Sequence, residues 1–326
     1  MRLTMTCWNY DRVNALLDGR VRVPGVELNI EIQYPTQIFA RAFTEAPHDI
    51  SELSASTYVM QLAKGDCPYV ALPAFVSRAF RHGGFYVRAD RAIARPQDLE
   101  GRLVGVPEYQ MTMALWARGL LADEYGVDTD AIRYRTGGTN EPGRKERLAL
   151  ALPSHMDVAP IAAGQSLNDL LVAGELDAVI APSPPDAFTA GDARVRRLFP
   201  DVRAAEQNYF RRTGIFPIMH LIGIRRELAD AWPGLARAVY DALVESRRLA
   251  MEDLETTATA SANRIHLPWL AAEWEDTREL MGADFWPYGL ARNREALDAL
   301  CRYSVAQHLA PRRLDPDQLF HPETME

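Results

Sequence analysis

The sequence has 326 residues, of which 48% are hydrophobic and 25% charged, as is usual for a globular protein with one large or two medium domains. Its formal net charge of -8 argues against a nucleic-acid partner, because such partners require a basic face. No apolar run approaches the ~20 residues of a membrane-spanning helix, so we expect no membrane partner either.

Short strand-like and helix-like segments alternate along most of the chain. Runs of alternating or continuous apolar residues predict strands at residues 2–8, 26–32, 49–54, 69–75, 83–88, 102–106, 132–136, 177–180 and 218–224. Helical periodicity predicts helices at residues 10–17, 38–46, 56–64, 107–126 and 166–173, and mostly helix beyond residue 232. This alternation is typical of α/β proteins whose sheets are mostly parallel.

The alternation of strands and helices begins again once along the chain, which predicts two lobes. We assign residues 1–88 and 207–326 to a discontinuous lobe I and residues 89–206 to an inserted lobe II. Two extended segments, at 85–87 and 218–224, would carry the chain out and back. Ligands of such sheets bind at the carboxyl ends of strands and between lobes, so we expect the ligand cleft there.

The N-terminus and the cysteines bear on the compartment. Residues 1–8 lack the basic and apolar segments of a secretory signal. The three cysteines, Cys7, Cys67 and Cys301, are far apart, odd in number and without metal-ligand spacing, which fits a reducing environment. We therefore expect a cytoplasmic protein.

The segment from Arg211 to His220 carries the strongest functional signal. It places Arg211, Arg212 and His220 directly before an apolar strand. Arginine matches a carboxylate bidentately, and histidine is the side chain best suited to move a proton near neutral pH. The segment therefore indicates a pocket for an anionic, carboxylated molecule. The alternative is a surface arginine pair before an ordinary edge strand.

Nine segments in order resemble the 4,5-dihydroxyphthalate decarboxylase family. They read YDR, LLDG, SELS, GDCP, SRAFRH, GVPEYQMT, RTGG, RRTGIFPIMH and MGADFWPYG. The resemblance implies the two-lobe fold of type II periplasmic solute-binding proteins and the loss of carbon dioxide from 4,5-dihydroxyphthalate, which gives protocatechuate. Gly83 and Gly84 depart from the bulkier or hydroxylated residues expected there, which leaves the substrate open, including another hydroxylated benzoate.

The implied reaction needs few protein groups. One carboxylate must be held, the phenol must lose its proton, and the ring carbon must gain one. For the carboxylate we select Arg12, Arg81, Arg211 and Arg212. Holding the departing carboxylate too firmly would stabilise the ground state, so we expect these arginines to bind the carboxylate that stays. For each of them the alternative is a weak surface ion pair.

His82 and His220 are the candidates for proton transfer, with Glu108 third. Each histidine lies near one predicted crossing segment, and one could protonate the ring while the other accepts from the phenol. The alternative for each is a buried histidine bonded to backbone. Glu108 is placed at the start of a helix, where an acid is favoured for structural reasons alone, and the free amides of Tyr109 and Gln110 could instead bind a substrate oxygen.

The same segments contribute further residues that we predict to contact the substrate. The alternative is that these residues only pack in the core or lie on the surface. They are Tyr10, Tyr109 and Trp286 as aromatic walls, and Glu52, Ser54, Thr136 and Asp284 as polar groups. We expect no cofactor. A divalent metal held by His82, His220, Glu52 and Asp284 is the alternative, although the scattered spacing does not require one.

Two classes of function remain open from the sequence. The first is a cofactor-free aromatic acid decarboxylase, a carboxy-lyase. The second is a non-catalytic protein that binds an aromatic carboxylate for transport or sensing, which would need only the arginines and aromatic walls. In both, the partner is a small aromatic carboxylate. The C-terminal helices allow a homo-oligomer, but no surface patch in the sequence supports one.

Overall fold

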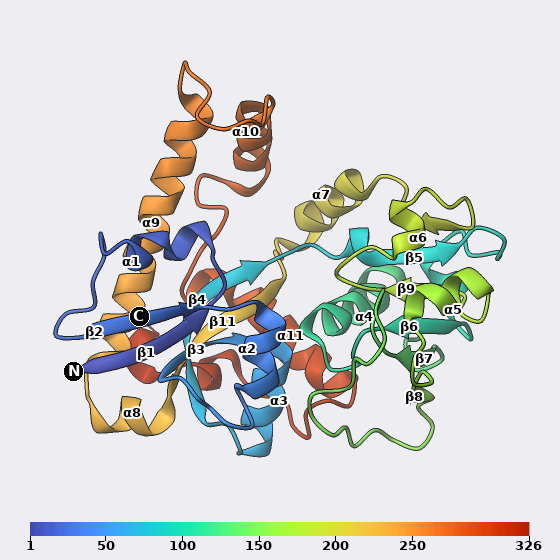
Figure 1. Ribbon diagram of the computed structural model, residues 1–326, viewed down its shortest axis with the longest axis horizontal. Coiled ribbons are helices and arrows are strands. Elements are labelled where there is room, and N and C mark those ends of the chain that lie inside the picture. Colours follow the sequence, from blue (N-terminus) through green and yellow to red (C-terminus); the bar gives the residue numbers. More distant parts are fainter. Residues whose placement is uncertain (326) are drawn as a thin grey trace. The chain divides into compact units, whose positions relative to one another are not determined.

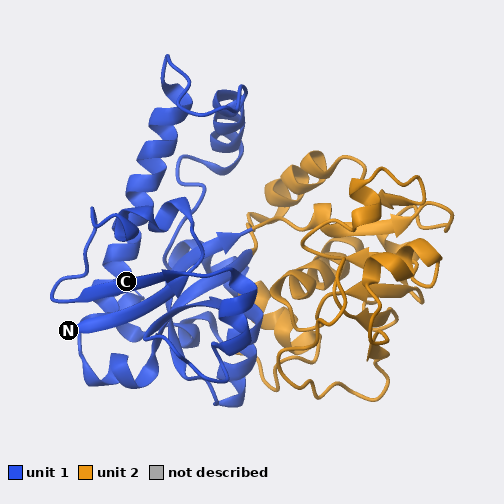
Figure 2. Cartoon of the chain, in the orientation of Figure 1, with its two compact units in different colours: residues 1–78, 218–297, 315–326 blue, residues 79–217, 298–314 orange. Residues whose placement is uncertain are grey.

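The computed structural model describes residues 1–325, which form two compact units (Figure 2). Unit 1 comprises 1–78, 218–297 and 315 to the end of the described chain, and unit 2 comprises 79–217 and 298–314. The boundaries predicted after residue 88 and before residue 207 both fall inside unit 2. The reason is that β5 (Phe85–Arg88) pairs within the unit 2 sheet and α7 (Val202–Thr213) contacts η2 (His82–Gly84).

The sheet of unit 1 has five strands in the order β2-β1-β3-β11-β4 (Figure 1). β1 (Arg2–Cys7) pairs in parallel with β2 (Glu27–Ile32) and β3 (Ile50–Ser54). β11 (Ile218–Arg225) runs antiparallel to both β3 and β4 (Tyr69–Arg78). The sheet is therefore mixed rather than mostly parallel, because the strand that brings the chain back from unit 2 runs opposite to its neighbours.

Burial explains why these strands carry so little polar sequence. All five residues of β3 are buried, and nine of the ten in β4 are too, so both strands are covered on their two faces. α3 (Ala55–Lys64) follows β3 without a loop and ends at Gly65, whose φ of 82° is left-handed and suits glycine. Polar residues within β3 are thus forced into the interior, where they need partners.

The remaining helices of unit 1 follow the sheet strands or lie in the C-terminal half. The α-helices are α1 (Asn14–Leu17), α2 (Pro35–Arg41), α8 (Arg226–Ala231), α9 (Leu235–Thr259) and α10 (Leu270–Met281). The 3-10 helices are η1 (Asp11–Val13), η4 (Ala291–Asn293), η5 (Pro316–Leu319) and η6 (Pro322–Thr324). In Figure 1 the 25-residue α9 extends beyond the sheet, and α10 lies beside its far end. No described residue of α10 is buried.

Unit 2 has a six-stranded sheet in the order β10-β5-β9-β6-β7-β8. Its four parallel strands are β6 (Leu103–Val106), β7 (Arg133–Thr136), β8 (Val158–Pro160) and β9 (Ala178–Ile180). β5 and β10 (Val195–Arg197) complete it in antiparallel pairing. The helices of this unit are η3 (Pro96–Leu99), α4 (Thr112–Tyr125), α5 (Leu167–Ala173), α6 (Asp186–Thr189), η2 and α7. The two-unit α/β architecture predicted from the sequence is confirmed.

α11 (Arg294–Ala306) contains a unit boundary, between Leu297 and Asp298. Its second half packs on α4 of unit 2. Gln307 lies just beyond α11, and its side-chain Nε2 donates to the carbonyl of Leu115 over 2.9 Å. Its side-chain Oε1 accepts from Nε of the fully buried Arg118 over 2.8 Å. No pattern in the sequence indicated that residues 298–314 belong to unit 2.

Within residues 1–325, no helix combines the length and the apolar composition that crossing a membrane would require.

We predict that Gly119→Ala destabilises the protein, although alanine is the better helix former by about 1 kcal/mol. A β-carbon on Gly119, inside α4, would lie 2.3 Å from the ring of Tyr303 on α11. That ring is buried and its hydroxyl donates to Asp123 over 2.5 Å, so it cannot easily move. We expect a net loss of about 1–3 kcal/mol in the free energy of unfolding, measured by denaturant titration.

The matched background for this test is Tyr303→Ala, which removes the obstructing ring. In that background Gly119→Ala should be neutral or stabilising. An unfolding free energy that rises when Gly119→Ala is made in the otherwise unchanged protein would contradict the packing described here.

Candidate functional site

A buried carboxylate lies at the centre of the candidate site in unit 1. Glu52 is on β3 and is fully buried. Its Oε2 accepts from the backbone N–H of Trp8 over 2.8 Å, and its Oε1 accepts from the hydroxyl of Tyr10 over 2.8 Å. Both donors follow β1, the parallel neighbour of β3. The carboxyl ends of two adjacent parallel strands thus meet at this side chain.

His220 completes this arrangement from the other side. Its Nδ1 lies 2.6 Å from Oε1 of Glu52, and a carboxylate can only accept, so Nδ1 carries the proton in this contact. The opposite ring nitrogen, Nε2, is then left to exchange a proton. The side chain is 18% exposed, and its ring packs edge-on against Phe39 with the centroids 4.8 Å apart.

The strand register explains why His220 points at Glu52. His220 pairs with Ser54 of β3, and the pairing of β11 with β4 shifts on both sides of it. Such irregularities change the direction of a side chain, and they are common beside functional sites. Ser54, a predicted substrate contact, is buried and accepts from the hydroxyl of Thr57 over 3.2 Å.

Tyr10 is a neutral hydrogen-bond donor in this site. Burial raises the pKa of its phenol far above the usual value, and the nearby charge of Glu52 and the hydrogen bond to it raise it further. The hydroxyl also lies 3.3 Å from Nδ1 of His220. Tyr10 therefore helps to hold the Glu52 and His220 pair, whereas the sequence suggested an aromatic wall for the substrate.

Arg12 lies next to this group, held against two aromatic rings. Its guanidinium carbon is 4.5 Å from the ring centroid of Tyr10 and 4.2 Å from that of Trp286. Its Nε donates to the carbonyl of Val76 over 2.7 Å, and its Nη1 donates to Asp11 over 2.7 Å. Trp286 is fixed in turn, because its indole N–H donates to the carbonyl of Phe75 over 2.8 Å. Among residues 1–325, Nη2 of Arg12 makes no hydrogen bond.

Asp284, predicted as a substrate contact, forms ion pairs with two arginines. It pairs with Arg247 from α9 and with Arg292. Arg78, at the end of β4, is a further buried cation; burial lowers the pKa of its guanidinium to about 9, and it donates to the carbonyl of Pro287 over 2.8 Å. Sequence reasoning missed Arg78 and Arg247. Arg78 lies inside the SRAFRH motif, from which the prediction had selected Arg81 as the arginine that binds a carboxylate.

His82 belongs to unit 2 and has a different environment. It is 1% exposed, and neither ring nitrogen has a hydrogen-bond partner among the described residues. Its ring is surrounded edge-on by Phe199, Tyr125 and Tyr209, with centroids 5.1, 6.4 and 5.6 Å away. Burial, together with the charge of Arg212, lowers the pKa of His82 to about 4. Near neutral pH this imidazole is therefore uncharged and has no proton to spare.

Glu108 also lies in unit 2, and its carboxylate binds two arginines. Its Oε1 accepts from Arg144 over 2.8 Å and its Oε2 from Arg147 over 2.6 Å, while the side chain itself is buried. With both oxygens occupied by guanidinium groups, it is poorly suited to donate a proton. The predicted placement in the first helical turn is wrong, because α4 begins only at Thr112.

The backbone amides that follow Glu108 are occupied by the chain itself. Those of Tyr109 and Gln110 donate to the carboxylate of Glu146, whose pKa is raised by burial. The expectation that they bind a substrate oxygen is therefore replaced by an internal contact. The ring of Tyr109 is buried 3.7 Å beneath the guanidinium of Arg118 and edge-on to Tyr134, so it packs in the core rather than lining a site.

The other predicted residues of unit 2 are spread over several elements. Arg211 and Arg212 lie in the last turn of α7. They do not lie directly before a strand, because β11 begins only at Ile218. Arg212 donates to Glu124 over 3.0 Å and Arg211 to Asn208 over 2.9 Å.

Two further predicted contacts in unit 2 are more enclosed. Burial lowers the pKa of the half-buried Arg81 to about 10, while the carboxylate of Glu206 opposes this shift. Thr136, at the end of β7, is buried. Whether either residue touches a substrate stays a prediction.

The four residues predicted as alternative metal ligands have different partners in the structure. Glu52 and His220 bond to each other, Asp284 pairs with arginines, and His82 is enclosed by aromatic rings in unit 2. A group with metal-ligand spacing does occur among the described residues, but it consists of Asp130, His155 and His308.

Comparison with curated proteins identifies the family. The chain is 41% identical over 326 residues to the 4,5-dihydroxyphthalate decarboxylase of Comamonas testosteroni, covering 100% of this chain and 98% of that protein. It is also 41% identical over 211 residues to the protein of the same name from Pseudomonas putida, covering 65% of this chain and 82% of that protein. The chain belongs to the 4,5-dihydroxyphthalate decarboxylase family. The resemblance predicted from its motifs is confirmed, and with it membership of a family of carboxy-lyases.

Comparison with solved structures supports the fold. The alkanesulfonate-binding protein SsuA of Xanthomonas axonopodis pv. citri matches with a TM-score of 0.51 and 16% identity, covering 99% of this chain and 97% of that one. The periplasmic aliphatic sulphonate-binding protein SsuA of Escherichia coli matches with a TM-score of 0.53 and 13% identity, covering 98% and 96%. No family model matches the chain. The predicted periplasmic-binding-protein-like fold is therefore confirmed.

We predict that His82 makes stability depend on pH. Its pKa falls from an ordinary 6.5 to about 4 on folding, so between these pH values the unfolded chain binds the extra proton and the folded chain does not. The free energy of unfolding should therefore decrease as pH falls through this window, by about 3 kcal/mol in total. His82→Phe should abolish that part of the pH dependence, measured by urea unfolding at pH 7 and pH 4.

The control variant is His266→Phe, at an exposed histidine of unit 1. It should keep the full pH dependence. If His82→Phe and the unsubstituted protein lost equal stability between the two pH values, the buried, uncharged state assigned to His82 would be wrong.

Proposed function

We propose that this protein decarboxylates 4,5-dihydroxyphthalate to protocatechuate, with His220 as the group that moves the proton. The family relationship supports the reaction, because the relative from Comamonas testosteroni aligns over the whole chain. The observation that carries the choice of residue is the 2.6 Å contact between Nδ1 of His220 and the buried Glu52. It fixes the tautomer and leaves Nε2 for proton exchange.

The substrate's own chemistry determines what the protein must add. Each carboxylate of 4,5-dihydroxyphthalate is para to a hydroxyl group. As that hydroxyl loses its proton, electron density moves to the ring carbon that bears the carboxylate. This carbon accepts a proton, the carbon–carbon bond to the carboxylate breaks, and its electrons restore the aromatic ring as carbon dioxide leaves. The net reaction consumes one proton, which the phenolate or the ring must receive from the protein or water.

His220 is suited to supply that proton. With Nδ1 bonded to Glu52, Nε2 is the ring nitrogen that can take up a proton and deliver it to the ring carbon. The hydrogen bonds from Trp8 and Tyr10 hold Glu52 in place, which keeps the imidazole aligned. His82 and Glu108 rank behind His220, because one is an uncharged buried ring and the other is saturated by two arginines.

Arg12 is the best candidate to bind the carboxylate that stays on the ring. Its guanidinium is held in place by Val76, Asp11 and two aromatic rings, so little side-chain freedom is lost on binding. It shares Tyr10 with the Glu52 and His220 group. Binding the remaining carboxylate stabilises the ground state and the transition state alike and so sets affinity more than rate.

No step of this reaction requires a metal or an organic cofactor, so we propose a cofactor-free enzyme whose partner is a small aromatic dicarboxylate. The alternative is binding without turnover. Incubation of the purified protein with 4,5-dihydroxyphthalate, with protocatechuate and carbon dioxide as the measured products, distinguishes the two. Saturable binding without product would contradict the proposal.

We predict that His220→Gln lowers kcat by about 10²–10⁴-fold, the usual contribution of a positioned acid or base. The affinity for 4,5-dihydroxyphthalate should stay within about tenfold, measured by titration calorimetry. Glu52→Gln should lower kcat less and should alter the pH profile of kcat, because Glu52 acts only through His220. The matched control, His266→Gln, changes an exposed histidine of the same unit and should leave kcat unchanged. Full activity of the His220 variant would move the proton chemistry elsewhere.

We predict that Arg12→Ala raises KM by about 10–100-fold while kcat changes much less, since the lost contact is made equally in ground and transition states. Arg12→Lys should recover only part of the affinity, because lysine lacks the planar fork. Steady-state kinetics of Arg211→Ala provide the comparison. A larger rise in KM for that variant than for Arg12→Ala would place the carboxylate-binding arginine in unit 2.

A further inference from the structure

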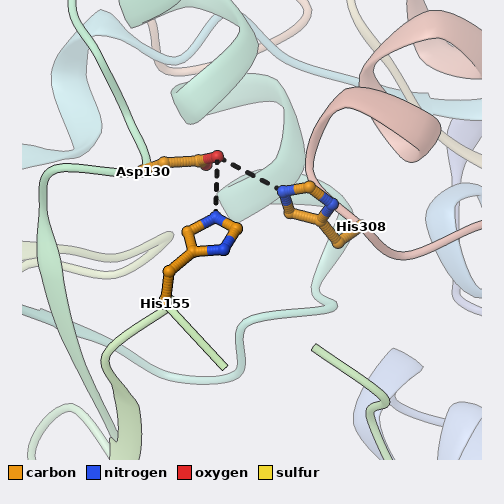
Figure 3. A group of neighbouring side chains, drawn as sticks. All are labelled: Asp130, His155 and His308. Atoms are coloured by element: carbon orange, nitrogen blue, oxygen red, sulfur yellow. Dashed lines mark hydrogen bonds and ion pairs between the residues drawn. The ribbon is translucent and has the colours of Figure 1, made fainter. Parts of the chain in front are cut away.

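Two histidines and an aspartate converge in unit 2, outside the candidate site of unit 1 (Figure 3). Nε2 of His308 lies 3.3 Å from Oδ2 of Asp130, and Nε2 of His155 lies 3.6 Å from the same oxygen. The two imidazole rings are 5.7 Å apart and nearly perpendicular. One ligand atom from each residue lies within 4.8 Å of the other two.

The three residues come from segments that are far apart in the chain. Asp130 lies in the turn between α4 and β7, His155 precedes β8, and His308 follows α11. Asp130 and His308 are 178 positions apart in sequence. Their convergence is therefore a product of the fold, not of local sequence.

The backbone holds two of these residues firmly. The amide of Asp130 donates to Asp128 over 3.1 Å. His308 has a φ of 60°, a left-handed conformation that few residues other than glycine adopt, and its amide donates to the carbonyl of Val305 over 3.0 Å. This conformation turns the His308 ring back toward Asp130 instead of continuing α11.

The spacing fits a shared metal ion better than direct hydrogen bonds. Separations of 3.3 and 3.6 Å are long for hydrogen bonds between imidazole and carboxylate, which are usually below about 3.0 Å. Two ligands of a tetrahedral zinc ion, each bound at about 2.0–2.1 Å, lie roughly 3.3 Å apart. Two imidazoles with one carboxylate are a donor set that selects zinc-class ions over magnesium or calcium.

We propose that Asp130, His155 and His308 bind a divalent ion of the zinc class. The side chains are between 30% and 60% exposed, so a water molecule can fill a fourth position. The ion would join the segment 298–314 to the body of unit 2, next to the contact of Gln307 with Arg118. Its role is structural, and it takes no part in the proposed decarboxylation.

The test uses the full-length chain, stripped with a chelator and titrated with zinc chloride in a calorimeter. We expect one equivalent to bind and the melting temperature to rise, and magnesium to have no comparable effect. His308→Gly and His155→Gln should each weaken zinc binding at least tenfold and reduce the rise in melting temperature. Glycine suits the left-handed φ at position 308, so His308→Gly is expected to fold at least as stably as the unsubstituted protein.

The control is His266→Gln, which removes an exposed histidine of unit 1 and should leave zinc binding unchanged. Equal zinc affinity in the unsubstituted protein and in both the His308→Gly and His155→Gln variants would overturn the proposal, as would the absence of any zinc-induced rise in melting temperature. Turnover of 4,5-dihydroxyphthalate is assayed separately, so failure of the metal site and failure of the proposed function are distinguishable.

Discussion

The burial of Glu52 is the constraint on which the unit 1 site depends. A carboxylate on a strand covered on both faces is strongly disfavoured unless hydrogen-bond donors surround it. Trp8 and Tyr10 supply two donors from the end of the neighbouring strand, and His220 supplies the third. The same contacts that make the carboxylate tolerable in the interior also orient the imidazole. Stability and chemistry therefore rest on one group of atoms, which is why Glu52 cannot be exchanged for an apolar residue without loss of the site.

Acidic side chains elsewhere in the protein also have partners close by. Although the net charge is -8, two other acids named above, the buried Glu108 and the partly exposed Asp284, are paired with guanidinium groups. Glu108 accepts from Arg144 and Arg147, and Asp284 pairs with Arg247. Removing the arginine partners of the buried Glu108 would leave an uncompensated charge in the interior, which usually costs about 3–5 kcal/mol. Arg12 differs from these arginines, because it is held by backbone, aromatic rings and one exposed aspartate and keeps a terminal nitrogen without a hydrogen bond. That difference is the physical reason for preferring it as the residue that binds an anion.

The two histidines that look alike in the sequence have opposite environments in the structure. His220 is hydrogen-bonded to a carboxylate, whereas His82 is enclosed by aromatic rings in an interior whose burial lowers its pKa to about 4. Neither outcome follows from the neighbouring residues alone, since each histidine adjoins arginines or apolar residues in the chain. The contacts that separate them come from β3 in one case and from α7 and Phe199 in the other.

The amino-acid sequence by itself determined the α/β class, nearly all strand positions, the division into two units and the family, because periodicity and local motifs are properties of contiguous residues. It also singled out Glu52, Tyr10, Arg12 and His220. Only the tertiary structure decided that these four belong together, that Glu108 and Asp284 are bound by arginines, and that His155 and His308 meet at Asp130. Those pairings depend on strand order, on the register shift beside His220 and on the return of residues 298–314 to unit 2. Contacts between residues that are far apart in sequence do not change the hydrophobic periodicity of either segment. Each segment therefore predicts the same helix or strand whether or not its partner is present.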